Sequence, residues 1–432
     1  MSSSVENKNL GEGYWAIVMK QFRKKKLAVW SLRFFYFMVV LALLADFVAN
    51  EKPYYCQYKG NTYFPLFKGI AVDYGFATWN SEFVNAEWIN MEFETAVFPP
   101  VTYSATTIDI ANSQYKGPFD EQEIKPFHRK HFMGTDQIGR DVAAGMIFGT
   151  RIALLVGVIS MAISSLIGIF LGAISGYFGD ERLQVSRVSL WLNVAFFFFA
   201  WYYAFQNRSY QLSDAMNGSF VGFFAQIALS ILIFCVVMLI PNLLALGLKR
   251  ISFLGKKVSI PLDILVMRSI EVINSIPITL LILSLVAILK KPSILWVMVI
   301  IGFTGWTGIA KYVRAELLRV RNLEYIEASQ SFGFSEWRII FKHALPNSLS
   351  PVLISIAFGI AGAILVESGL SFLGIGVQAE LQTWGKLLSQ AREEVSAWWL
   401  AIFPGVAIFI SVTVFNLIGE GLTDAMDPRL KQ

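Results

Sequence analysis

Long apolar segments constrain this chain more than any other feature of its sequence. A helix needs about 20 predominantly apolar residues to cross roughly 30 Å of hydrocarbon. The 432-residue chain is 55% hydrophobic and only 16% charged, and eight of its segments approach or exceed that length. We expect spans at residues 27–48, 151–177, 188–206, 221–248, 269–289, 294–310, 348–370 and 398–418. The sequence therefore predicts an all-α polytopic membrane protein and not an ordinary soluble domain.

The spans divide the chain into four parts. We expect a polar N-terminus at 1–26, a first transmembrane helix at 27–48, an outer loop or subdomain at 49–150 and a membrane domain at 151–432. No small-residue cleavage site follows the first apolar segment, so we interpret it as a retained span and not as a signal peptide. The third span contains four successive phenylalanines at 196–199, and a re-entrant or interfacial placement stays open there.

Loop charges predict the orientation. Five basic residues precede the first span, at Lys20, Arg23, Lys24, Lys25 and Lys26. Basic residues mark cytoplasmic loops, so we expect this end inside, and an even number of spans then returns the C-terminus to the same side. Lys249, Arg250, Lys256 and Lys257 also fall inside, whereas Lys290-Lys291 would lie outside. Because the basic residues gather at helix ends, the net charge of +5 does not indicate nucleic-acid binding.

The outer segment at 50–148 is too long for a simple connector. It is rich in tyrosine and tryptophan, which disordered segments lack, so we expect a small folded subdomain. Cys56 lies in this polar region and Cys235 in an apolar span, which makes a disulfide between them unexpected.

The second span carries glycines four residues apart, at Gly168, Gly172 and Gly176. This spacing lets helix backbones approach closely. Ordinary bundle packing is the preferred interpretation, and a packing face beside a transport pathway is the alternative.

A polar island separates two long apolar segments at residues 311–346. Residues 308–331 continue the sixth span as a polar helix. Gly333 suits a position with positive φ after that helix, and Ser335 can cap a second helix that starts at Glu336 and ends before Pro346. The pattern predicts a helix–turn–helix that a soluble partner can grip. An amphipathic hairpin lying on the membrane surface is the alternative.

Four motifs, in order along the chain, resemble those of a known transporter family. They are residues 134–141 (GTDQIGRD), 327–333 (EASQSFG) with Leu345-Pro346, 371–378 (SFLGIGVQ) with 383–385 (TWG), and 424–429 (DAMDPR). The chain resembles the C-type permease subunit of ABC importers of the dipeptide, oligopeptide and nickel branch. The resemblance covers roughly 1–50, 128–180 and 260–432. It implies a type I permease fold with about eight helices, namely six family helices and a pair inserted at 181–260. The outer loop at 50–127 is also longer than in the family.

The resemblance implies how such a subunit works. In the family, the turn around the glycine docks in a groove of the ATPase subunit. Carried over, this assigns the coupling to Glu327, Ala328, Ser329, Phe332, Gly333 and Phe334. The implied partners are a second, homologous permease, two ATPase domains that bind ATP and magnesium, and an extracytoplasmic solute-binding protein. The implied location is the bacterial inner membrane, and no cofactor is expected in this chain.

The residues themselves offer no catalytic constellation. Gly255-Lys256 and Gly385-Lys386 lack the upstream glycine of a phosphate-binding loop, so hydrolysis would come from another chain. His128 and His131, with Asp136 nearby, make a metal site conceivable, but we favour a structural role. No metal site and no catalytic residue is therefore predicted.

Three residues are candidates for the pathway or its gate. Pro277 would kink the fifth span, and Asn274 precedes it. Glu367 lies near the outer end of the seventh span, where it either lines a gate or has a structural role. Glu271 is either a buried acid or an interfacial group near Arg268.

We therefore expect a permease subunit that moves peptides or related small solutes by alternating access. An ion-coupled secondary transporter is the main alternative, but it predicts an inverted repeat and acids deep in several spans, which are not seen. An intramembrane hydrolase would need a Ser–His pair or an HExxH sequence, and neither is present. The sequence leaves the solute open among peptides of different length, nickel chelates, glutathione and opines.

Overall fold

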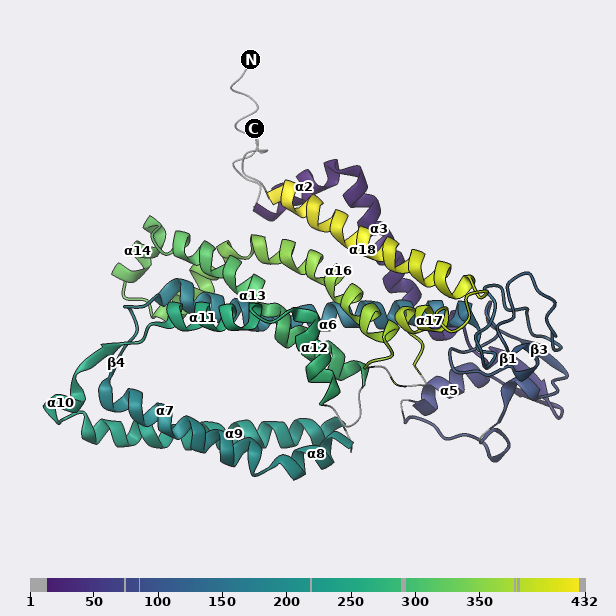
Figure 1. Ribbon diagram of the computed structural model, residues 1–432, viewed down its shortest axis with the longest axis horizontal. Helices are drawn as coiled ribbons and strands as arrows, with labels where there is room; N and C mark the ends of the chain where they lie inside the picture. The colour runs from purple at the N-terminus through teal and green to yellow at the C-terminus, as the bar shows by residue number, and fades with distance from the viewer. Residues whose placement is uncertain are drawn as a thin grey trace, which may run out of the picture. The chain divides into compact units, whose positions relative to one another are not determined.

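The computed structural model describes residues 14–73, 75–84, 86–217, 220–288, 293–376, 378 and 381–426 (Figure 1). Two parts of the predictions lie outside these ranges. They are Lys290-Lys291, which did not fit the charge rule, and residues 427–429 at the end of the last motif. The chain divides into two compact units. One joins Met1–Ala173 to Ile270–Gln432, and the other is Ile174–Ser269.

Helices dominate both units. The α-helices are α2 (Tyr14–Lys24), α3 (Lys26–Leu43), α4 (Ala45–Val48), α5 (Pro65–Asp73), α6 (Val142–Phe178), α7 (Arg187–Trp201), α8 (Ser209–Asn217), α9 (Phe220–Leu248), α10 (Ser252–Gly255), α11 (Leu262–Asn274), α12 (Ile278–Ala287), α13 (Ile294–Val320), α14 (Glu324–Ser331), α15 (Glu336–Arg338), α16 (Ser350–Phe372), α17 (Trp384–Gln390) and α18 (Trp399–Met426). Short 3₁₀ turns are η1 (Ser81–Phe83), η2 (Trp88–Asn90), η3 (Ile110–Asn112) and η6 (Leu345–Ser348), and π turns are η4 (Tyr202–Gln206) and η5 (Ile339–Ala344).

Seven helices within the described ranges are long and apolar enough to cross a bilayer, and a bent pair can supply an eighth span. This agrees with the predicted eight. The third predicted span is a continuous helical segment, Arg187–Gln206, of spanning length. Two boundaries were wrong, because α6 begins at Val142 and not at 151, and α18 continues to Met426 and does not end at 418. The expected kink at Pro277 is an 81° bend between α11 and α12.

The outer region is folded, as predicted, but it is not helical throughout. Strand β1 (Tyr55–Tyr58) pairs antiparallel with β2 (Asn61–Tyr63) and with β3 (Thr95–Val97), with Cys56 opposite Tyr63 and Ala96. Aromatic rings pack over this sheet, among them Phe83 and Trp88, whose centroids lie 5.2 Å apart. Cys56 is buried and free, and Cys235 is also free, so the described cysteines form no disulfide.

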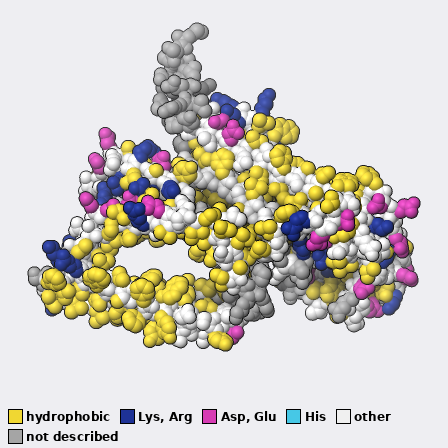
Figure 2. Space-filling view, viewed as in Figure 1, with side chains coloured by type: hydrophobic (Ala, Val, Ile, Leu, Met, Phe, Trp, Pro, Cys, Tyr) yellow, Lys and Arg dark blue, Asp and Glu magenta, His cyan; other side chains and the backbone are white. Residues whose placement is uncertain are grey.

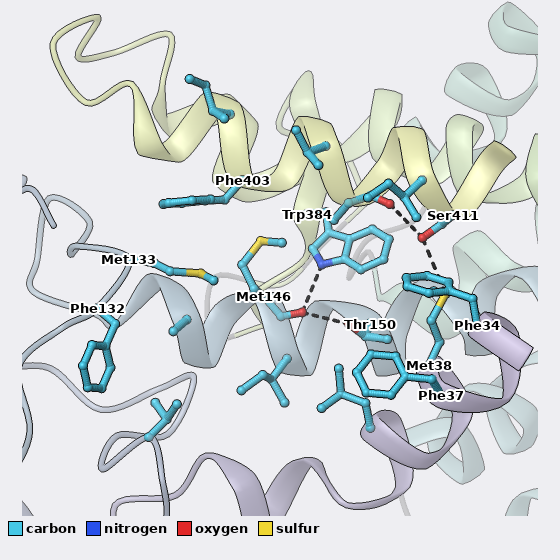
Figure 3. A pocket seen from close by; sticks show the side chains of 18 residues that line it. Phe34, Phe37, Met38, Phe132, Met133, Met146, Thr150, Trp384, Phe403 and Ser411 are labelled. Atoms are coloured by element: carbon cyan, nitrogen blue, oxygen red, sulfur yellow. Dashed lines mark hydrogen bonds between the residues drawn. The ribbon is translucent and has the colours of Figure 1, made fainter. Parts of the chain in front are cut away.

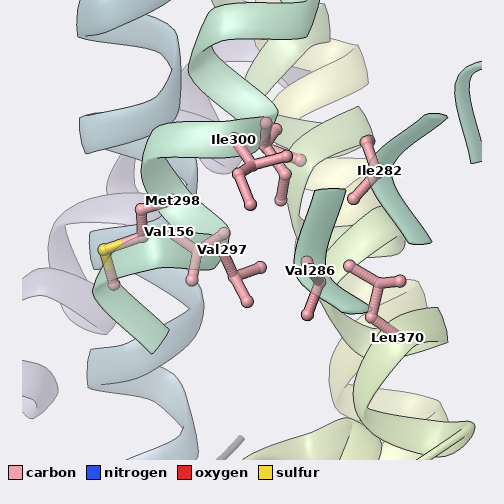
Figure 4. Close-up of a cluster of buried hydrophobic side chains, with 9 residues drawn as sticks. Val156, Ile282, Val286, Val297, Met298, Ile300 and Leu370 are labelled. Atoms are coloured by element: carbon pink, nitrogen blue, oxygen red, sulfur yellow. The ribbon is translucent and has the colours of Figure 1, made fainter. Parts of the chain in front are cut away.

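The first unit has its main apolar core where α6, α12, α13 and α16 meet. Figure 4 draws this cluster, in which Val156, Ile282, Val297 and Leu370 are buried. Helix α18 packs on α16 and α3. The ion pair between Lys25 and Asp424 (2.6 Å) joins the start of α3 to the end of α18. Arg151 of α6 binds Asp46 at 2.7 Å, so the acid near the end of the first span is paired.

Helices α6 and α13 touch through small residues. A Cβ atom added at Gly168 would lie 2.8 Å from the Ile309 Cβ, and one at Gly172 would lie 2.6 Å from the carbonyl oxygen of Ala310. Two helical turns before Gly168, on the same face of α6, Ser160 donates a hydrogen bond to the carbonyl of Met298 at 2.9 Å. The glycines therefore form the close-packed helix face that their spacing predicts.

The second unit is a helical hairpin. Helices α7 and α9 pack along each other, and the strands β4 (Gln184–Ser186) and β5 (Lys257–Ser259) pair antiparallel at one end, with Val185 opposite Val258. Figure 1 labels α7, α8, α9, α10 and β4 in this unit. It contains all of the segment that the sequence identifies as an insertion, 181–260.

Candidate functional site

The polar island folds as a compact hairpin after α13. Its first helix is α14, and its second arm runs through α15 and η5 into η6. Ile326, Ile339, Ile340 and Ala344, which come from both arms, are fully buried. The predicted continuous helix over 308–331 was wrong, because residues 321–323 separate α13 from α14. The hairpin is thus a folded element with buried side chains on both of its arms.

The turn of the hairpin has the predicted backbone. Gly333 has a φ of +74°, a left-handed conformation that other residues adopt only at a cost. A Cβ atom there would meet no atom within 4 Å, so the requirement for glycine is conformational and not steric. Ser335 does precede the second helix, but its side chain makes no capping hydrogen bond.

The predicted coupling residues separate into two groups. Phe332 is 78% exposed at the tip, and Glu327, Ala328 and Gly333 are also exposed. Ser329 is buried and donates a hydrogen bond to the carbonyl of Tyr325 at 2.7 Å. These exposed groups can meet a partner, whereas Ser329 stabilises the hairpin itself.

Phe334 is half-buried. It stacks on His343 with a centroid distance of 5.9 Å, and the guanidinium of Arg338 lies 4.3 Å from its ring centroid. The sequence analysis missed a second exposed aromatic pair, Trp337 and Phe341, which stack at 5.8 Å. Their spacing of four residues in a helical arm was the signal that could have found them.

Two of the three pathway candidates, Asn274 and Pro277, flank the same bend, and the third, Glu367, lies on another helix. The Oγ1 atom of Thr307 donates to the Oδ1 atom of Asn274 at 3.2 Å, which links the end of α11 to α13. Pro277 lies in the bend before α12. Glu367 of α16 is only 1% exposed and accepts a hydrogen bond from Ser371 at 2.6 Å. Glu271 is exposed on α11, so it is not the buried acid of the first interpretation.

A cavity of about 370 Å³ lies beside the bend. It is lined by residues of α6, α12, α13 and α16, including Ile278, Gly305, Gly308 and Gly359. Its wall is predominantly apolar, and serine, threonine and tyrosine side chains are the polar residues among its lining.

Figure 3 shows a second cavity, of about 710 Å³, between α3, α6 and α18. The indole Nε1 of Trp384 and the hydroxyl of Thr150 both donate to the carbonyl of Met146, at 3.1 Å. Ser411 donates to the carbonyl of Ala407 at 2.7 Å. Because these polar groups are already bonded within the chain, the cavity is not suited to a polar solute.

The GTDQIGRD motif is a structural turn that starts α6. Asp136 accepts hydrogen bonds from the backbone amides of Ile138 (3.0 Å) and Arg140 (2.8 Å). Gly139 has a φ of +89°, and a Cβ atom there would lie 2.0 Å from the carbonyl oxygen of Asp109. Asp141 then caps α6 by accepting from the Ala144 amide at 2.7 Å, which explains why the helix starts earlier than expected.

His131 is held between two carboxylates and not beside Asp136. Its Nδ1 atom lies 2.7 Å from Asp141 and its Nε2 atom 3.3 Å from Asp109. Burial disfavours the imidazolium, but the hydrogen bonds to both carboxylates outweigh it and raise the pKa of His131. Burial also opposes the charge on Asp109, yet the bonds from His131 and Asn112 lower the pKa of Asp109.

This Asp–His–Asp cluster was missed because its members lie far apart in the sequence, with Asp109 separated from the motif. His128 is also buried, against the ring of Phe98 at 4.6 Å. Within the described ranges, no three His, Cys, Asp or Glu side chains are grouped to hold a metal ion. The structure gives both histidines a packing role.

The fold and the hairpin define the class of protein. It is a multi-pass helical membrane protein with a folded polar hairpin between two spans.

Comparison with known proteins gives the family. The family model of the binding-protein-dependent transport system inner membrane component matches residues 251–432. The model of the N-terminal transmembrane domain of oligopeptide transport permease C matches residues 13–65. The chain belongs to the family of binding-protein-dependent transport system inner membrane components, the permeases of ABC transporters.

Three relatives illustrate the similarity. The oligopeptide transport system permease protein OppC of Haemophilus influenzae is 32% identical over 301 residues, which cover 69% of this chain and 70% of the relative. The inner membrane ABC transporter permease protein YejE of Escherichia coli is 28% identical over 425 residues, 97% of each chain. The peptidoglycan transport system permease protein YejE of Agrobacterium fabrum is 28% identical over 436 residues, 95% of this chain and 92% of the relative.

Proposed function

We propose that this chain is a permease subunit of an ATP-driven importer of peptides. The observation that carries the proposal is its similarity, over nearly its whole length, to ABC transporter permeases, together with relatives named for oligopeptide and peptidoglycan transport. A peptide attached to a peptidoglycan fragment and a free oligopeptide share a peptide backbone. We therefore assign the substrate class as peptides, including those released from peptidoglycan.

The exposed tip of the hairpin is the proposed contact with the ATPase. Phe332 is an exposed aromatic anchor, of the kind that carries much of the binding energy in interfaces, and Glu327 supplies charge beside it. The buried side chains of both arms, among them Ile326 and Ile340, hold the tip in a fixed position. A rigid tip transmits a displacement of the ATPase to the spans on either side, so no chemistry is required of this chain.

The solute pathway is proposed to follow the bend between α11 and α12. The helix is interrupted between Asn274 and Ile278, and the adjoining cavity is lined in part by glycines of α13 and α16. Broken helices in transporters often mark such pathways. Asn274 and Pro277 shape the bend, whereas Glu367 is buried and bonded, which favours a positioning role for it.

The orientation and the partners complete the proposal. We assign both termini and the hairpin to the cytoplasm, from the basic residues near them. The folded outer region then faces the solute-binding protein, and a homologous permease forms the second half of the membrane complex. ATP and magnesium are bound by the ATPase subunits.

The test is uptake by the reconstituted complex in proteoliposomes. The probes are a radiolabelled trialanine and the peptidoglycan tripeptide L-Ala-γ-D-Glu-diaminopimelate. We expect ATP-dependent uptake of at least one, and we expect Phe332→Ala to uncouple ATP hydrolysis from uptake. The control is Tyr210→Ala, which removes an exposed aromatic side chain of α8 outside both the hairpin and the outer region.

Three outcomes would contradict parts of the proposal. Uptake that depends on a proton gradient while ATP is present would favour an ion-coupled transporter. Uptake of neither probe would remove the peptide assignment. Wild-type coupling in the Phe332→Ala and Glu327→Ala variants would remove the hairpin from the coupling mechanism.

A further inference from the structure

A cluster of cations lies at one end of the inserted hairpin, and we call it the basic collar. It consists of Arg187, Lys249, Arg250, Lys256 and Lys257. Figure 2 shows Lys and Arg side chains gathered at the end of this unit where Figure 1 labels β4 and α10. The collar shares no residue with the proposed coupling hairpin, which is formed by α14, α15 and η5, or with the proposed pathway at the bend between α11 and α12.

Strand pairing assembles the collar from distant parts of the sequence. Ser186 lies opposite Lys257 in the β4–β5 pair, and the Arg187 amide donates to the carbonyl of Lys256 at 3.0 Å. This places the first residue of α7 beside the two lysines that follow α10. Lys249 and Arg250 come directly after the end of α9, so the collar surrounds the ends of two neighbouring spans.

The cations of the collar are available to a partner. Lys249, Arg250, Lys256 and Lys257 are all exposed. Among the ion pairs found within the described residues, none involves a member of the collar. A nearby acid, Asp180, accepts a hydrogen bond from the Ile264 amide at 3.1 Å. The collar is therefore a surface with unneutralised positive charge.

Apolar side chains project from the middle of the same segment. Ile251 is 52% exposed and Phe253 is 71% exposed. Lys249 and Arg250 come directly before the segment that contains them, and Lys256 and Lys257 come directly after it. The guanidinium of Arg187 lies 5.4 Å from the ring centroid of Phe253. Exposed apolar groups flanked by cations are typical of segments that sit at the boundary between headgroups and acyl chains.

We propose that the basic collar binds anionic phospholipid headgroups, with Phe253 and Ile251 inserted among the upper acyl chains. The lipid phosphate matches the free cations, and the hydrocarbon matches the apolar side chains. Basic clusters beside transmembrane helices attract anionic lipids, and each cation near the surface changes the affinity by about fivefold. An acidic protein partner would explain the cations but not the apolar residues at the ends of two spans.

The experiment measures lipid binding to the purified complete transporter by native mass spectrometry. The complex in detergent is titrated with phosphatidylglycerol or with phosphatidylcholine of the same acyl chains. We expect a preference for phosphatidylglycerol that falls by tenfold or more in the variant Lys249→Gln/Arg250→Gln/Lys256→Gln/Lys257→Gln. The matched control, Lys249→Arg/Lys256→Arg/Lys257→Arg, keeps the charges and should keep the preference. Phe253→Ala should weaken binding of both lipids.

Two results would overturn the proposal. One is an unchanged lipid preference in the glutamine variant. The other is loss of an ATPase or other protein subunit from that variant with its lipid binding intact, which would assign the collar to an acidic protein surface. If the fourfold variant does not assemble, Lys249→Gln/Arg250→Gln, outside the β4–β5 pair, is measured in the same way. A severalfold loss of preference is then expected, and no loss would reject the lipid site.

Discussion

At the scale of single residues, backbone conformation and buried charge determine what the motifs do. Gly333 is required by its positive φ, with free space around it. Asp141 does two things at once, because one carboxylate oxygen caps α6 and the other binds His131. The turns, caps and buried hydrogen-bond network thus give these motif residues a structural explanation.

Replacing Gly333 by alanine should loosen the coupling hairpin. The left-handed conformation costs a residue with a Cβ atom about 1–2 kcal/mol, and no steric clash is added. We expect backbone amides of α14 and η5 to exchange hydrogen roughly 5- to 30-fold faster, as measured by exchange and mass spectrometry. Gly405→Ala, in helix α18 and also in open space, should leave exchange unchanged. Equal rates in both variants would contradict the conformational argument.

The Asp109–His131–Asp141 cluster should make stability depend on pH. The pKa of His131 is raised, so its contribution is complete below about pH 6.5 and is lost as the pH rises through the folded-state pKa. The pKa of Asp109 is lowered, so its contribution is complete above about pH 4 and is lost on acidification.

The measurement is the thermal unfolding midpoint of the purified complex from pH 4 to 9. Burial lowers the pKa of His128, which acts in the opposite direction. The wild type is therefore compared with His131→Asn at each pH. We expect the stabilisation lost in the variant to be largest between about pH 4 and 6.5. A difference that grows above pH 7 would show that the imidazolium does not stabilise the fold.

At the scale of elements, close helix contact explains the interior of the first unit. The row Ser160, Ser164, Gly168 and Gly172 on α6 faces α13. Ser164 donates to the carbonyl of Gly302 at 2.8 Å, as Ser160 does to Met298. The two helices therefore approach with polar and small groups, and no large side chain separates their backbones.

Gly172→Ala should destabilise this helix pair. The new Cβ atom would lie 2.6 Å from the carbonyl oxygen of Ala310, a backbone atom that cannot rotate away. Overpacking of this kind costs about 1–3 kcal/mol, so the urea midpoint of the complex should fall. Gly308→Ala on α13 meets no atom within 4 Å and is the matched control. A midpoint unchanged by Gly172→Ala would mean that the helices separate easily.

The elements also show what sequence can and cannot predict. Apolar runs identified every span, since length and hydropathy suffice for that. The start of α6 was missed because Asp141 caps a turn of mixed polarity. The break after Val320 was missed because α13 and α14 have similar helical patterns. The placement of His131 depended on Asp109, and a contact between distant loop residues leaves no local pattern.

At the scale of the whole molecule, the chain combines a permease of its family with an additional compact unit, Ile174–Ser269. The additional unit begins and ends at adjacent points, because the Ile260 amide donates to the carbonyl of Leu183 at 2.9 Å. The family models match residues 13–65 and 251–432, on either side of most of this unit.

Replacing residues 184–259 with a short Gly-Ser turn should leave the rest of the permease folded. The two ends are already hydrogen-bonded neighbours, so closing the gap adds little strain. We expect the shortened chain to assemble with its partners in size-exclusion chromatography and to lose the preference for phosphatidylglycerol. The control keeps the whole unit and carries only two added linker residues between 217 and 220. Aggregation of the shortened chain, while this control stays soluble, would show that the rest of the permease depends on the inserted unit.

The contact between α6 and α13 has a mechanical consequence. Helix α6 has 37 residues and is about 55 Å long, so it extends beyond the hydrocarbon layer. It begins at the turn that anchors the outer region, and its partner α13 leads to the coupling hairpin. Because their backbones lie in contact along the row of small residues, we expect the two helices to move together, so that a displacement at the end of α13 is carried along the length of α6.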